Sequence, residues 1–544
     1  MAKRFGVMLD MSRNAVKTVA ELKRYMKYLS DFGYNMVQLY TEDTYEIEGE
    51  PYFGYLRGRY SAEELREVVR YAESLGIEVI PCVQTLAHLN AIFKWRKYHE
   101  INDCSNILLV EDERTYEFID NMFRSLRACF TTDIAHIGMD EAHMLGLGKY
   151  LDIHGHKNRF EILSRHLSRV MEIGKKYGFR CIMWSDMFFR LANGGGYYDW
   201  NNITDDVIAS CPKDVGLVYW DYYHNEKSFY DGMLKAHKRF GNEVWFGGGA
   251  WTWIGLAPFT SFTIDSMEKA MASCREHGIE NIMLTMWGDN GGECSPNAML
   301  PALYHLKRYY DGVTDPEVIR REFREITGED FDAMMALELP NMVAGNTPKS
   351  PSNPSKVMLF SDPLFGFIDV TVKDGVAPEF AAHREKLNEY AKNSSHFGYI
   401  FDTNAKLCDV LEIKYDLGVR TRRAYKAGDR AALGQLLGDY AECAERVKAL
   451  HLAFSKQWHT ENKPHGFEVH DARYGGIVAR LEACARRISA YLDGEIDVLE
   501  ELEEELLPYD MALEKCYAIN GTPGKDDIPG IDRAGYAYTV NCIN

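Results

Sequence analysis

Short apolar runs alternate with amphipathic segments along the first 315 residues of the chain. Eight of these runs have the length of buried strands, and they cover residues 5–9, 36–40, 77–83, 134–139, 181–184, 216–220, 244–248 and 282–287. Between them, the spacing of apolar positions predicts helices over residues 19–32, 62–75, 115–129, 160–177, 230–240 and 266–277. Five of the helices precede a glycine, the residue that most often ends a helix: Gly33, Gly76, Gly178, Gly241 and Gly278. Strands that alternate with helices in this way predict a (β/α)8 TIM barrel, with a doubly wound open sheet as the alternative.

The strand rhythm ends near residue 316, and the remaining chain is mainly helical in pattern. Helices are predicted over residues 378–390, 408–425, 430–455 and 475–491. Residues 340–356 are rich in Pro, Ser and Asn, which predicts an exposed connection. The polar and aromatic segment 458–476 is either an interhelix loop or a surface that packs on the barrel or on a neighbouring subunit. We therefore predict two domains, a barrel over residues 1–315 and a mainly helical C-terminal domain over residues 316–544.

Composition and charge narrow the classes of partner. The chain has 544 residues, of which 46% are hydrophobic and 26% are charged, as is typical of an ordered globular protein. Its formal net charge of −19 disfavours binding to a nucleic-acid backbone or to an anionic membrane. The first residues lack the apolar core of a secretory signal, and no apolar run is long enough to span a membrane. We therefore expect a cytoplasmic protein whose partners are uncharged small molecules.

The cysteines carry no sign of a disulfide framework or of a metal site. All 12 are scattered singly, without a CxxC pair or a short metal-ligand spacing. Several lie in apolar segments, where a thiol behaves as a small hydrophobic group. We therefore expect free thiols in a reducing compartment, with neither a metal nor a cofactor.

Two adjacent carboxylates, Asp140 and Glu141, follow the fourth predicted strand directly. In α/β barrels the carboxyl ends of the strands carry the chemistry. Repulsion between neighbouring carboxylates raises the pKa of each, and a raised pKa suits a general acid that must be protonated near neutral pH. An acidic pair can also be no more than a solvated helix start. Its position after a buried strand favours the functional interpretation.

Aromatic residues gather at the same predicted rim. Five of the nine tryptophans lie at or just after strand ends, interleaved with Tyr219, Asp221 and Asp289; they are Trp184, Trp220, Trp251, Trp253 and Trp287. Sugar rings pack their CH faces on aromatic planes, and their hydroxyls bind carboxylates. The rim therefore has the composition of a saccharide pocket.

Several of these segments resemble motifs of glycoside hydrolase family 20, the β-N-acetylhexosaminidases. Residues 9–13, Leu-Asp-Met-Ser-Arg, resemble the first-strand motif with its substrate-binding Arg, and residues 77–88 resemble the third-strand segment that ends in a loop His. Residues 135–141 resemble the motif of the catalytic pair. Tyr-Trp-Asp at 219–221 and Trp-Gly-Asp at 287–289 resemble two further substrate-binding motifs. The resemblance covers roughly residues 1–315.

The chain also departs from the family pattern at several positions. Cys82 and Gln84 stand where many members carry acids, and Met139 replaces the usual Gly before the pair. Asp289 stands where Glu is common, so that Glu293 competes for its role. A small N-terminal domain of many members is missing, because the first strand begins almost at once. The resemblance thus implies a divergent branch of the family.

The resemblance implies hydrolysis of terminal β-linked N-acetylglucosamine or N-acetylgalactosamine with the substrate's acetamido group as nucleophile. Glu141 would be the acid and base, Asp140 would hold the acetamido N–H, and Tyr219 would bind the acetamido oxygen. Arg13 would contact ring hydroxyls, with a structural ion pair to Asp10 as its other interpretation. The remaining expected binding residues are His88, Trp184, Asp221, Trp251, Trp253, Trp287, Asp289 and Glu293. Expected partners are small saccharides or the nonreducing ends of glycans, and self-association stays open.

Three alternative functions are weighed against this interpretation. A retaining glycosidase with its own nucleophile is disfavoured because residues 247–264, after the seventh strand, contain no acid, although Asp186, Asp221 and Asp289 remain candidates. A metal-dependent barrel hydrolase would use histidines near the acid pair, namely His136, His143, His154 and His156. A carbohydrate-binding barrel without chemistry is the third alternative. The sequence leaves the choice of epimer, linkage and aglycone open.

Overall fold

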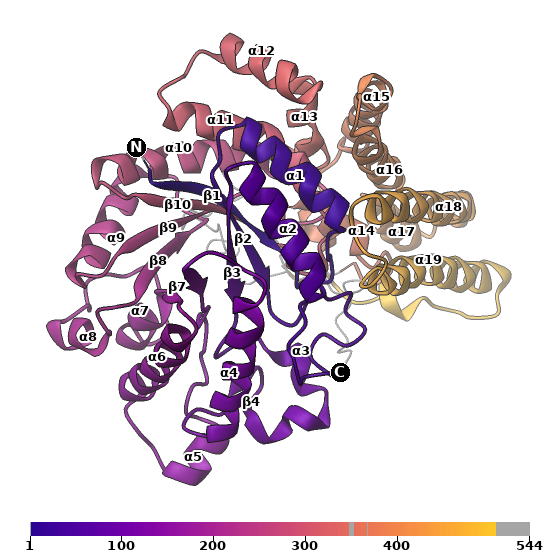
Figure 1. The fold of residues 1–544 in the computed structure, drawn as a ribbon. Helices are drawn as coiled ribbons and strands as arrows, with labels where there is room; N and C mark the ends of the chain where they lie inside the picture. Colours follow the sequence, from indigo (N-terminus) through magenta and orange to yellow (C-terminus); the bar gives the residue numbers. More distant parts are fainter. Residues whose placement is uncertain (1, 347–352, 367, 508–544) are drawn as a thin grey trace. The chain divides into compact units, whose positions relative to one another are not determined.

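The computed structural model describes residues 2–346, 353–366 and 368–507, and its central feature is a closed barrel of eight parallel strands (Figure 1). The order around the barrel is β1-β10-β9-β8-β7-β6-β3-β2, and β1 pairs with both β10 and β2, which closes the sheet. The strands are β1 Arg4–Asp10, β2 Met36–Thr41, β3 Glu78–Val83, β6 Ile134–His136, β7 Arg180–Trp184, β8 Gly216–Asp221, β9 Val244–Gly249 and β10 Asn281–Met286. The predicted TIM barrel is confirmed, and the open sheet is excluded.

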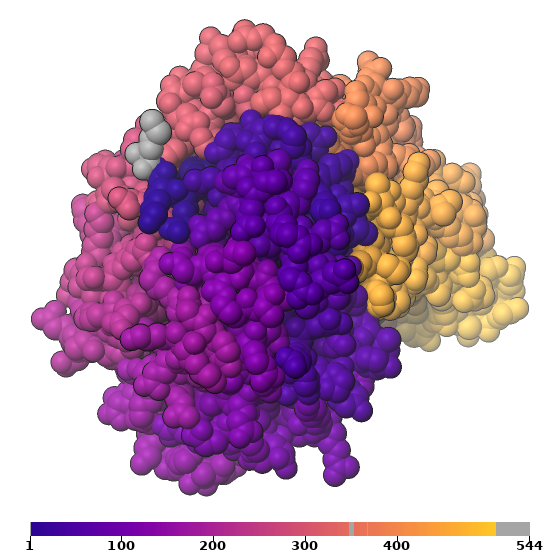
Figure 2. All heavy atoms as spheres, viewed as in Figure 1, coloured from indigo at the N-terminus to yellow at the C-terminus, as the bar shows by residue number. Residues whose placement is uncertain are grey.

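Six helices between the strands correspond to the predicted ones: α1 Val19–Asp31, α2 Ala62–Ser74, α4 Glu113–Arg127, α6 Arg159–Lys176, α9 Lys227–Arg239 and α10 Thr260–Glu276. Their bounds agree with the prediction within about three residues, except that α10 begins at residue 260 instead of 266. The shorter helices α3 Asn90–Phe93, α5 Lys149–His154, α7 Asp186–Ala192 and α8 Asp205–Ser210 were not predicted. Four of the six start with a side-chain cap. Thr18 accepts the amide of Glu21, and Ser61 forms a reciprocal capping box with Glu64. Asp112 and Asn158 cap α4 and α6 in the same way. In the space-filling view, atoms of the first half of the chain, coloured indigo to magenta, make up most of the face shown (Figure 2).

The fourth barrel strand is shorter than its apolar run. The sequence predicts a strand over residues 134–139, but β6 ends at His136. Gly138 and Met139 have φ angles of 68° and 71°, which cannot continue a strand. The chain therefore leaves the sheet three residues earlier than expected and enters a tight turn that carries the acid pair. Before β6, the connection also contains two short antiparallel strands, β4 Asn102–Cys104 and β5 Ile107–Leu108, which the sequence pattern did not predict.

The chain divides into two compact units. The first holds residues up to 250, 266–287 and 306–313, and with them every barrel strand. The second holds residues 251–265, 288–305 and those from 314 onward. The domain boundary expected near residue 315 stays a prediction.

The second unit is mainly helical, as the sequence predicts. Its helices from residue 314 onward are α12 Pro316–Thr327, α13 Phe331–Met335, α14 Pro354–Phe360, α15 Ala377–Asn393, α16 Gly398–Lys414, α17 Leu417–Lys426, α18 Arg430–Glu461 and α19 Glu468–Asp493. The predicted helix over residues 408–425 is thus divided between α16 and α17. Within the segment 458–476, only residues 462–467 form an interhelix loop, and the rest belongs to α18 and α19.

The exposed connection predicted over residues 340–356 is wrong where the structure describes it. Asn341, Asn353 and Ser355 are at most 1% exposed. The Ser355 hydroxyl donates to Asn341 at 2.6 Å, and the Asn353 amide donates to the carbonyl of Ile254 at 2.9 Å. Polar residues in this segment satisfy one another inside the unit, so their abundance does not indicate a surface loop.

Within the described ranges, no helix is long and apolar enough to cross a membrane. The ten cysteines that the structure describes are all free, as expected, and all of them except Cys104 are more than nine-tenths buried. The cytoplasmic location stays a prediction.

Candidate active site

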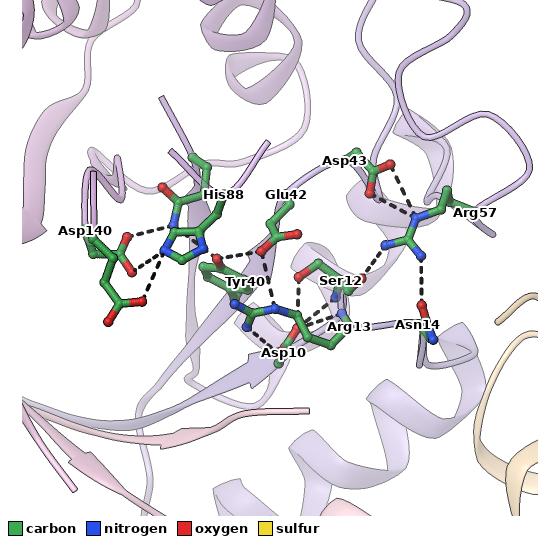
Figure 3. Close-up of polar contacts among 12 residues, drawn as sticks. Asp10, Ser12, Arg13, Asn14, Tyr40, Glu42, Asp43, Arg57, His88 and Asp140 are labelled. Atoms are coloured by element: carbon green, nitrogen blue, oxygen red, sulfur yellow. Dashed lines mark hydrogen bonds and ion pairs between the residues drawn. The ribbon is translucent and has the colours of Figure 1, made fainter. Parts of the chain in front are cut away.

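The loop after β1 is organised around the Asp10 carboxylate. One oxygen of Asp10 accepts the amides of Ser12 and Arg13 at 2.9 and 3.2 Å, and the other accepts a guanidinium N–H of Arg13 at 3.1 Å. The Arg13 Nε lies 3.4 Å from Glu42, which follows β2. Arg13 is thus held between two carboxylates at the carboxyl ends of adjacent strands (Figure 3), and the structural ion pair with Asp10 is present.

Gln84 and His88, in the loop after β3, connect this first group to the acid pair. The Gln84 amide N–H donates to the Tyr40 hydroxyl at 3.0 Å and to Asp140 at 2.8 Å. Its carbonyl oxygen accepts the amide of Met139 at 3.2 Å. The His88 Nε2 lies 3.2 Å from Asp140 and 3.8 Å from Glu141. One glutamine amide therefore orients both the side chain of Asp140 and the backbone before it.

The backbone that carries the acid pair is strained. Gly138, Met139 and Glu141 all have positive φ angles, of 68°, 71° and 51°, and His88 opposite them has a φ of 57°. Side chains rarely adopt this region, and such residues concentrate at functional sites. Gly138 admits no side chain, because a Cβ there would lie 2.1 Å from the Gln84 carbonyl oxygen. The turn thus brings the pair close to Gln84 and His88.

The two carboxylates have different environments. Asp140 exposes 11% of its side chain and Glu141 exposes 39%. Burial raises the pKa of Asp140, but the charge of His88 and hydrogen bonds from His88 and Gln84 lower it by more, to about 2. Burial lowers the pKa of His88, and the Asp140 carboxylate raises it by more, to about 9. The expectation that adjacency raises the pKa of both acids is therefore wrong for Asp140, because a buried cation outweighs the neighbouring carboxylate.

Asp186 and Arg190, on α7 (Asp186–Ala192) after β7, hold Glu141 from the other side. One Asp186 oxygen accepts the amide of Glu141 at 3.0 Å and the Arg190 Nε at 2.8 Å. A second Arg190 nitrogen donates to the Glu141 carboxylate at 3.1 Å. Asp186 is fully buried, and burial raises its pKa to about 7 although Arg190 lowers it. Backbone and side chain of Glu141 are thereby fixed by one buried ion pair.

Aromatic rings lie beside the charged groups. Trp184 at the end of β7 packs on His136 of β6 with ring centroids 4.5 Å apart, and it lies 6.1 Å from Trp287. Trp287 meets Tyr40 edge to face at 4.8 Å, and the Arg13 guanidinium lies 5.1 Å from the Trp287 ring. The predicted residues Arg13, Trp184 and Trp287 are therefore brought together with the acid pair by the barrel strands.

Tyr219 and Asp221 have surroundings other than those expected for substrate contacts. Tyr219 is fully buried, packs on His237 of α9 at 4.8 Å, and donates to Asp221 at 2.6 Å. Asp221 is also fully buried, and its oxygens accept the amides of Tyr223 and His224 and contact the His224 ring at 2.9 Å. Both side chains support the turn after β8 from the helix side.

Tyr222, three residues beyond Tyr219, lies on the other side of this turn. Its hydroxyl is hydrogen-bonded to the side chains of Thr285 and Trp287. Its pKa is raised well above the usual value by burial, with a contribution from the charge of Asp140. Tyr222 also stacks on Trp220 at 5.1 Å. Of Tyr219 and Tyr222, Tyr222 is therefore the one that contacts Trp287 and feels the charge of Asp140.

The other predicted residues belong to the second unit. Trp251 and Trp253 are buried and stack on each other at 4.4 Å, and the Trp251 amide donates to Thr263 at 3.0 Å. Glu293 is 4% exposed and forms a buried ion pair with Lys356 at 2.7 Å. Burial raises the pKa of Glu293, but Lys356, His470 and Arg473 together lower it by more. Asp289 is half-buried.

Comparison with known proteins decides the family. Residues 4–228 match the family model described as glycosyl hydrolase family 20, catalytic domain, and residues 332–518 match the model of a glycoside hydrolase 20C C-terminal domain. The chain belongs to glycoside hydrolase family 20. Its membership rests on these two models, which cover the barrel motifs up to residue 228 and most of the helical region.

Individual relatives are distant. A beta-hexosaminidase of Vibrio furnissii is 27% identical over 175 residues, which are 25% of this chain and 28% of that protein. Hexosaminidase D of Bos taurus is 23% identical over 227 residues, 40% of this chain and 62% of that protein. An exo-β-N-acetylglucosaminidase structure from Vibrio harveyi has 18% identity and a TM-score of 0.47, covering 62% of this chain and 58% of its own. The chain thus spans less than two thirds of the length of each of these relatives.

Several residues of this family 20 site were not predicted as site residues. Tyr40, Glu42, Gln84 and Arg190 contact Trp287, Arg13, Asp140 and Glu141, respectively. A signal existed for two of them, since Glu42 and Arg190 are charged residues shortly after strand ends. The histidines considered for a metal do not converge: in the described part of the chain, no group of three or more His, Cys, Asp or Glu is arranged to hold a metal ion.

Proposed function

We propose that this family 20 protein is an exo-acting β-N-acetylhexosaminidase that releases terminal β-linked N-acetylglucosamine or N-acetylgalactosamine from nonreducing ends. The observation that carries the proposal is the unequal pair after β6. Asp140 is buried and paired with His88, whereas Glu141 is the more exposed carboxylate of the two. An ionised steering group beside a more accessible acid is the division of labour that substrate-assisted hydrolysis requires.

In the first step, the carbonyl oxygen of the substrate's 2-acetamido group attacks the anomeric carbon. Glu141 donates a proton to the leaving oxygen as the glycosidic bond breaks. Asp140 accepts the acetamido N–H and stabilises the positive charge that develops on the ring of the oxazolinium intermediate. Gln84 and His88 hold Asp140 in place for this role, since both contact its oxygens.

In the second step, Glu141 takes a proton from water, and the water oxygen attacks the anomeric carbon to reopen the oxazolinium ring. The two displacements together retain the β configuration. The clamp formed by Asp186 and Arg190 keeps Glu141 in one place during both steps, which lowers the entropy cost of each proton transfer.

The aromatic and cationic residues bind the sugar. Trp184 and Trp287 provide ring surfaces for the sugar and its acetamido methyl group, and Arg13 contacts hydroxyls while Asp10 and Glu42 orient it. Trp251 and Trp253, which belong to the second unit, stay predicted binding residues. Asp289 is assigned to the sugar hydroxyls in preference to Glu293, because Lys356 already neutralises Glu293 inside the second unit.

The enzyme-nucleophile alternative loses two of its three candidates. Asp186 and Asp221 are fully buried, and both are engaged in hydrogen bonds. A nucleophile must reach the anomeric carbon of a bound sugar, and neither carboxylate is accessible. Asp289 alone remains, and it comes after β10 rather than after the seventh barrel strand.

The proposal is tested with three p-nitrophenyl glycosides that share one leaving group: N-acetyl-β-glucosaminide, N-acetyl-β-galactosaminide and β-glucoside. We expect turnover of one or both N-acetyl sugars and none of the glucoside above background, since the glucoside has no acetamido nucleophile. The ratio of the two N-acetyl rates fixes the epimer preference. Equal turnover of the glucoside would overturn substrate assistance.

A matched pair of variants tests which tyrosine binds the acetamido oxygen. Tyr222→Phe is expected to lower kcat by about tenfold to a hundredfold, because a hydrogen bond to a developing charge is lost. Tyr219→Phe is expected to keep kcat within about threefold and to lower the melting temperature, since it removes a buried bond to Asp221. Circular dichroism melts and steady-state kinetics on both variants measure these effects. A larger loss of kcat in Tyr219→Phe would reverse the assignment.

A further inference from the structure

Three aromatic rings form an exposed cluster in the first unit, here called the aromatic platform: Tyr52, Tyr55 and Trp95. The ring centroids of Tyr52 and Tyr55 lie 5.5 and 5.6 Å from that of Trp95 and 6.3 Å from each other. Tyr52 and Tyr55 are each 45% exposed, and Trp95 is half-buried. Clustered exposed aromatic surface is unusual in a soluble protein and marks a contact site.

The platform lies on the rim that carries the acid pair. Tyr52 and Tyr55 belong to the loop between β2 and α2, and Trp95 follows β3, so both segments leave the carboxyl ends of barrel strands. Arg57 ties the first loop to the site, since it donates to Asp43 at 3.2 Å and to Asn14 at 3.1 Å and also contacts the carbonyl of Ser12 (Figure 3). Ser12 and Asp43 adjoin Arg13 and Glu42 in the chain. The platform and the sugar-binding residues therefore share one framework.

The loop is rigid enough to present the rings in fixed positions. A backbone bridge between Tyr45 and Tyr60 closes its base. Phe53, between the two exposed tyrosines, is fully buried and packs on Tyr45 at 5.1 Å. Glu50 accepts the hydroxyl of Tyr98 at 3.0 Å, which links the loop to the segment that carries Trp95. Because the buried Phe53 anchors the loop, the rings of Tyr52 and Tyr55 are held in place at the surface.

Hydrogen-bond donors border the rings. The Lys94 Nζ lies 5.4 Å from the Trp95 ring centroid, and Arg96 follows on the other side. Both side chains are exposed. Flat rings edged by flexible donors match a sugar, whose CH faces pack on aromatic planes while its hydroxyls accept hydrogen bonds.

We propose that the aromatic platform binds the sugar units that follow the cleaved residue toward the reducing end of a glycan. This inference rests on the proposed function: an exo-acting site holds the terminal sugar, so the rest of the glycan must leave across the rim of the barrel. Linear glycans extended by several units would reach the platform, and a single sugar on a small aryl group would not. The platform is thus a specificity determinant for chain length.

The test compares kcat/KM for p-nitrophenyl N-acetyl-β-glucosaminide with kcat/KM for β-1,4-linked N-acetylglucosamine oligomers of two to six units. In the wild type, kcat/KM is expected to rise with oligomer length. Trp95→Ala and Tyr52→Ala are each expected to lower it by about twofold to tenfold for the long oligomers, through KM, because each removes one stacking ring. Both variants should stay within about twofold of the wild type on the aryl glycoside.

Leu56→Ala is the matched control. Leu56 is 68% exposed in the same loop but has no ring, so its loss should leave the length dependence unchanged. Trp95→Phe keeps a ring and should retain most of the wild-type length dependence. Equal losses in Leu56→Ala and Trp95→Ala would overturn the proposal, and so would variants that retain wild-type kinetics on every oligomer.

Binding measured without turnover separates this inference from the proposed function. Oligomers are titrated into Glu141→Gln protein while tryptophan fluorescence is recorded, with Trp95→Phe in the same background as reference. A length-dependent signal that Trp95→Phe removes supports the platform even if no N-acetylhexosaminide is hydrolysed. Absence of that signal in an active enzyme rejects the platform alone. A wild type that sediments as a dimer and a Trp95→Ala variant that sediments as a monomer would show a self-contact and overturn the proposal.

Discussion

Replacement of Glu141 by Gln is expected to lower kcat/KM on an unactivated N-acetylhexosaminide by about 10²–10⁴-fold, the usual contribution of a general acid and base. Glutamine keeps the shape of the side chain and a hydrogen-bond contact for Arg190, but it cannot give up a proton to the leaving oxygen. The loss should be smaller on p-nitrophenyl glycosides in the first step, because nitrophenolate leaves without protonation. Pre-steady-state kinetics on the two kinds of leaving group measure this difference.

Rescue of activity by azide distinguishes the catalytic roles of Glu141 and Asp140. In Glu141→Ala, azide fits the vacated volume and attacks the oxazolinium intermediate without a base, so a β-configured glycosyl azide should form and the rate should recover. Asp140→Asn should show no recovery, since the step that it impairs is formation of the intermediate. Near wild-type rates in Glu141→Gln, or an α-configured azide product, would remove Glu141 from the proposed role.

The sequence predicts the barrel well because the signal is repeated eight times. Each strand is a short apolar run between amphipathic helices, and an error in one run does not alter the topology. The end of β6 is different, since residues 137–139 are apolar and fully buried but adopt a turn. Hydrophobicity reports burial, and only the positive φ angles of Gly138 and Met139 show that the strand has ended.

Side-chain direction explains why the Tyr-x-Asp motif alone does not decide which tyrosine binds the substrate. The Tyr-x-Asp pattern at 219–221 is present, but Tyr219 faces His237 on α9, and Tyr222 beyond the strand faces Trp287. Successive residues of a strand point to opposite faces. A shift of one residue in the position of a motif therefore moves its side chains from the barrel interior to the face that packs on the helices. A single sequence does not determine on which side of the strand the tyrosine lies.

The electrostatics of the site depend on pairs that are remote in the sequence. The acid pair is adjacent in the chain, which suggested mutual repulsion, but the nearest charge to Asp140 in space is His88, and Arg190 and Asp186 contact Glu141. Each of these partners comes from another strand end. The sequence therefore identifies which residues carry charge, and the barrel decides which charges meet.

Replacement of Asp140 by Asn is the second change with a large expected effect. We expect kcat to fall by about 10²–10³-fold, because a preorganised negative charge beside the developing positive charge is removed. The amide keeps the volume and the contact with Gln84, so KM should change little. The variant should also lower the pKa of His88 from about 9, because the Asp140 carboxylate is the group that raises it against burial. Titration of the His88 ring by NMR in both proteins measures this pKa.

The same pair predicts how stability depends on pH. His88 titrates at about 9 in the folded protein against about 6.5 when unfolded, so its stabilisation is complete below about pH 6.5 and is lost as the pH rises through 9. Asp140 titrates at about 2 against about 3.9, so its stabilisation is complete above about pH 4 and is lost as the pH falls toward 2. The melting temperature of the wild type should therefore exceed that of Asp140→Asn most between about pH 4 and 6.5, and the gap should narrow toward pH 9. His88→Gln serves as the matched variant, because it removes the cation and leaves the carboxylate. A gap that stays constant from pH 5 to 9 would show that the two groups are not paired in the folded protein, and the steering role of Asp140 would then lose its structural support.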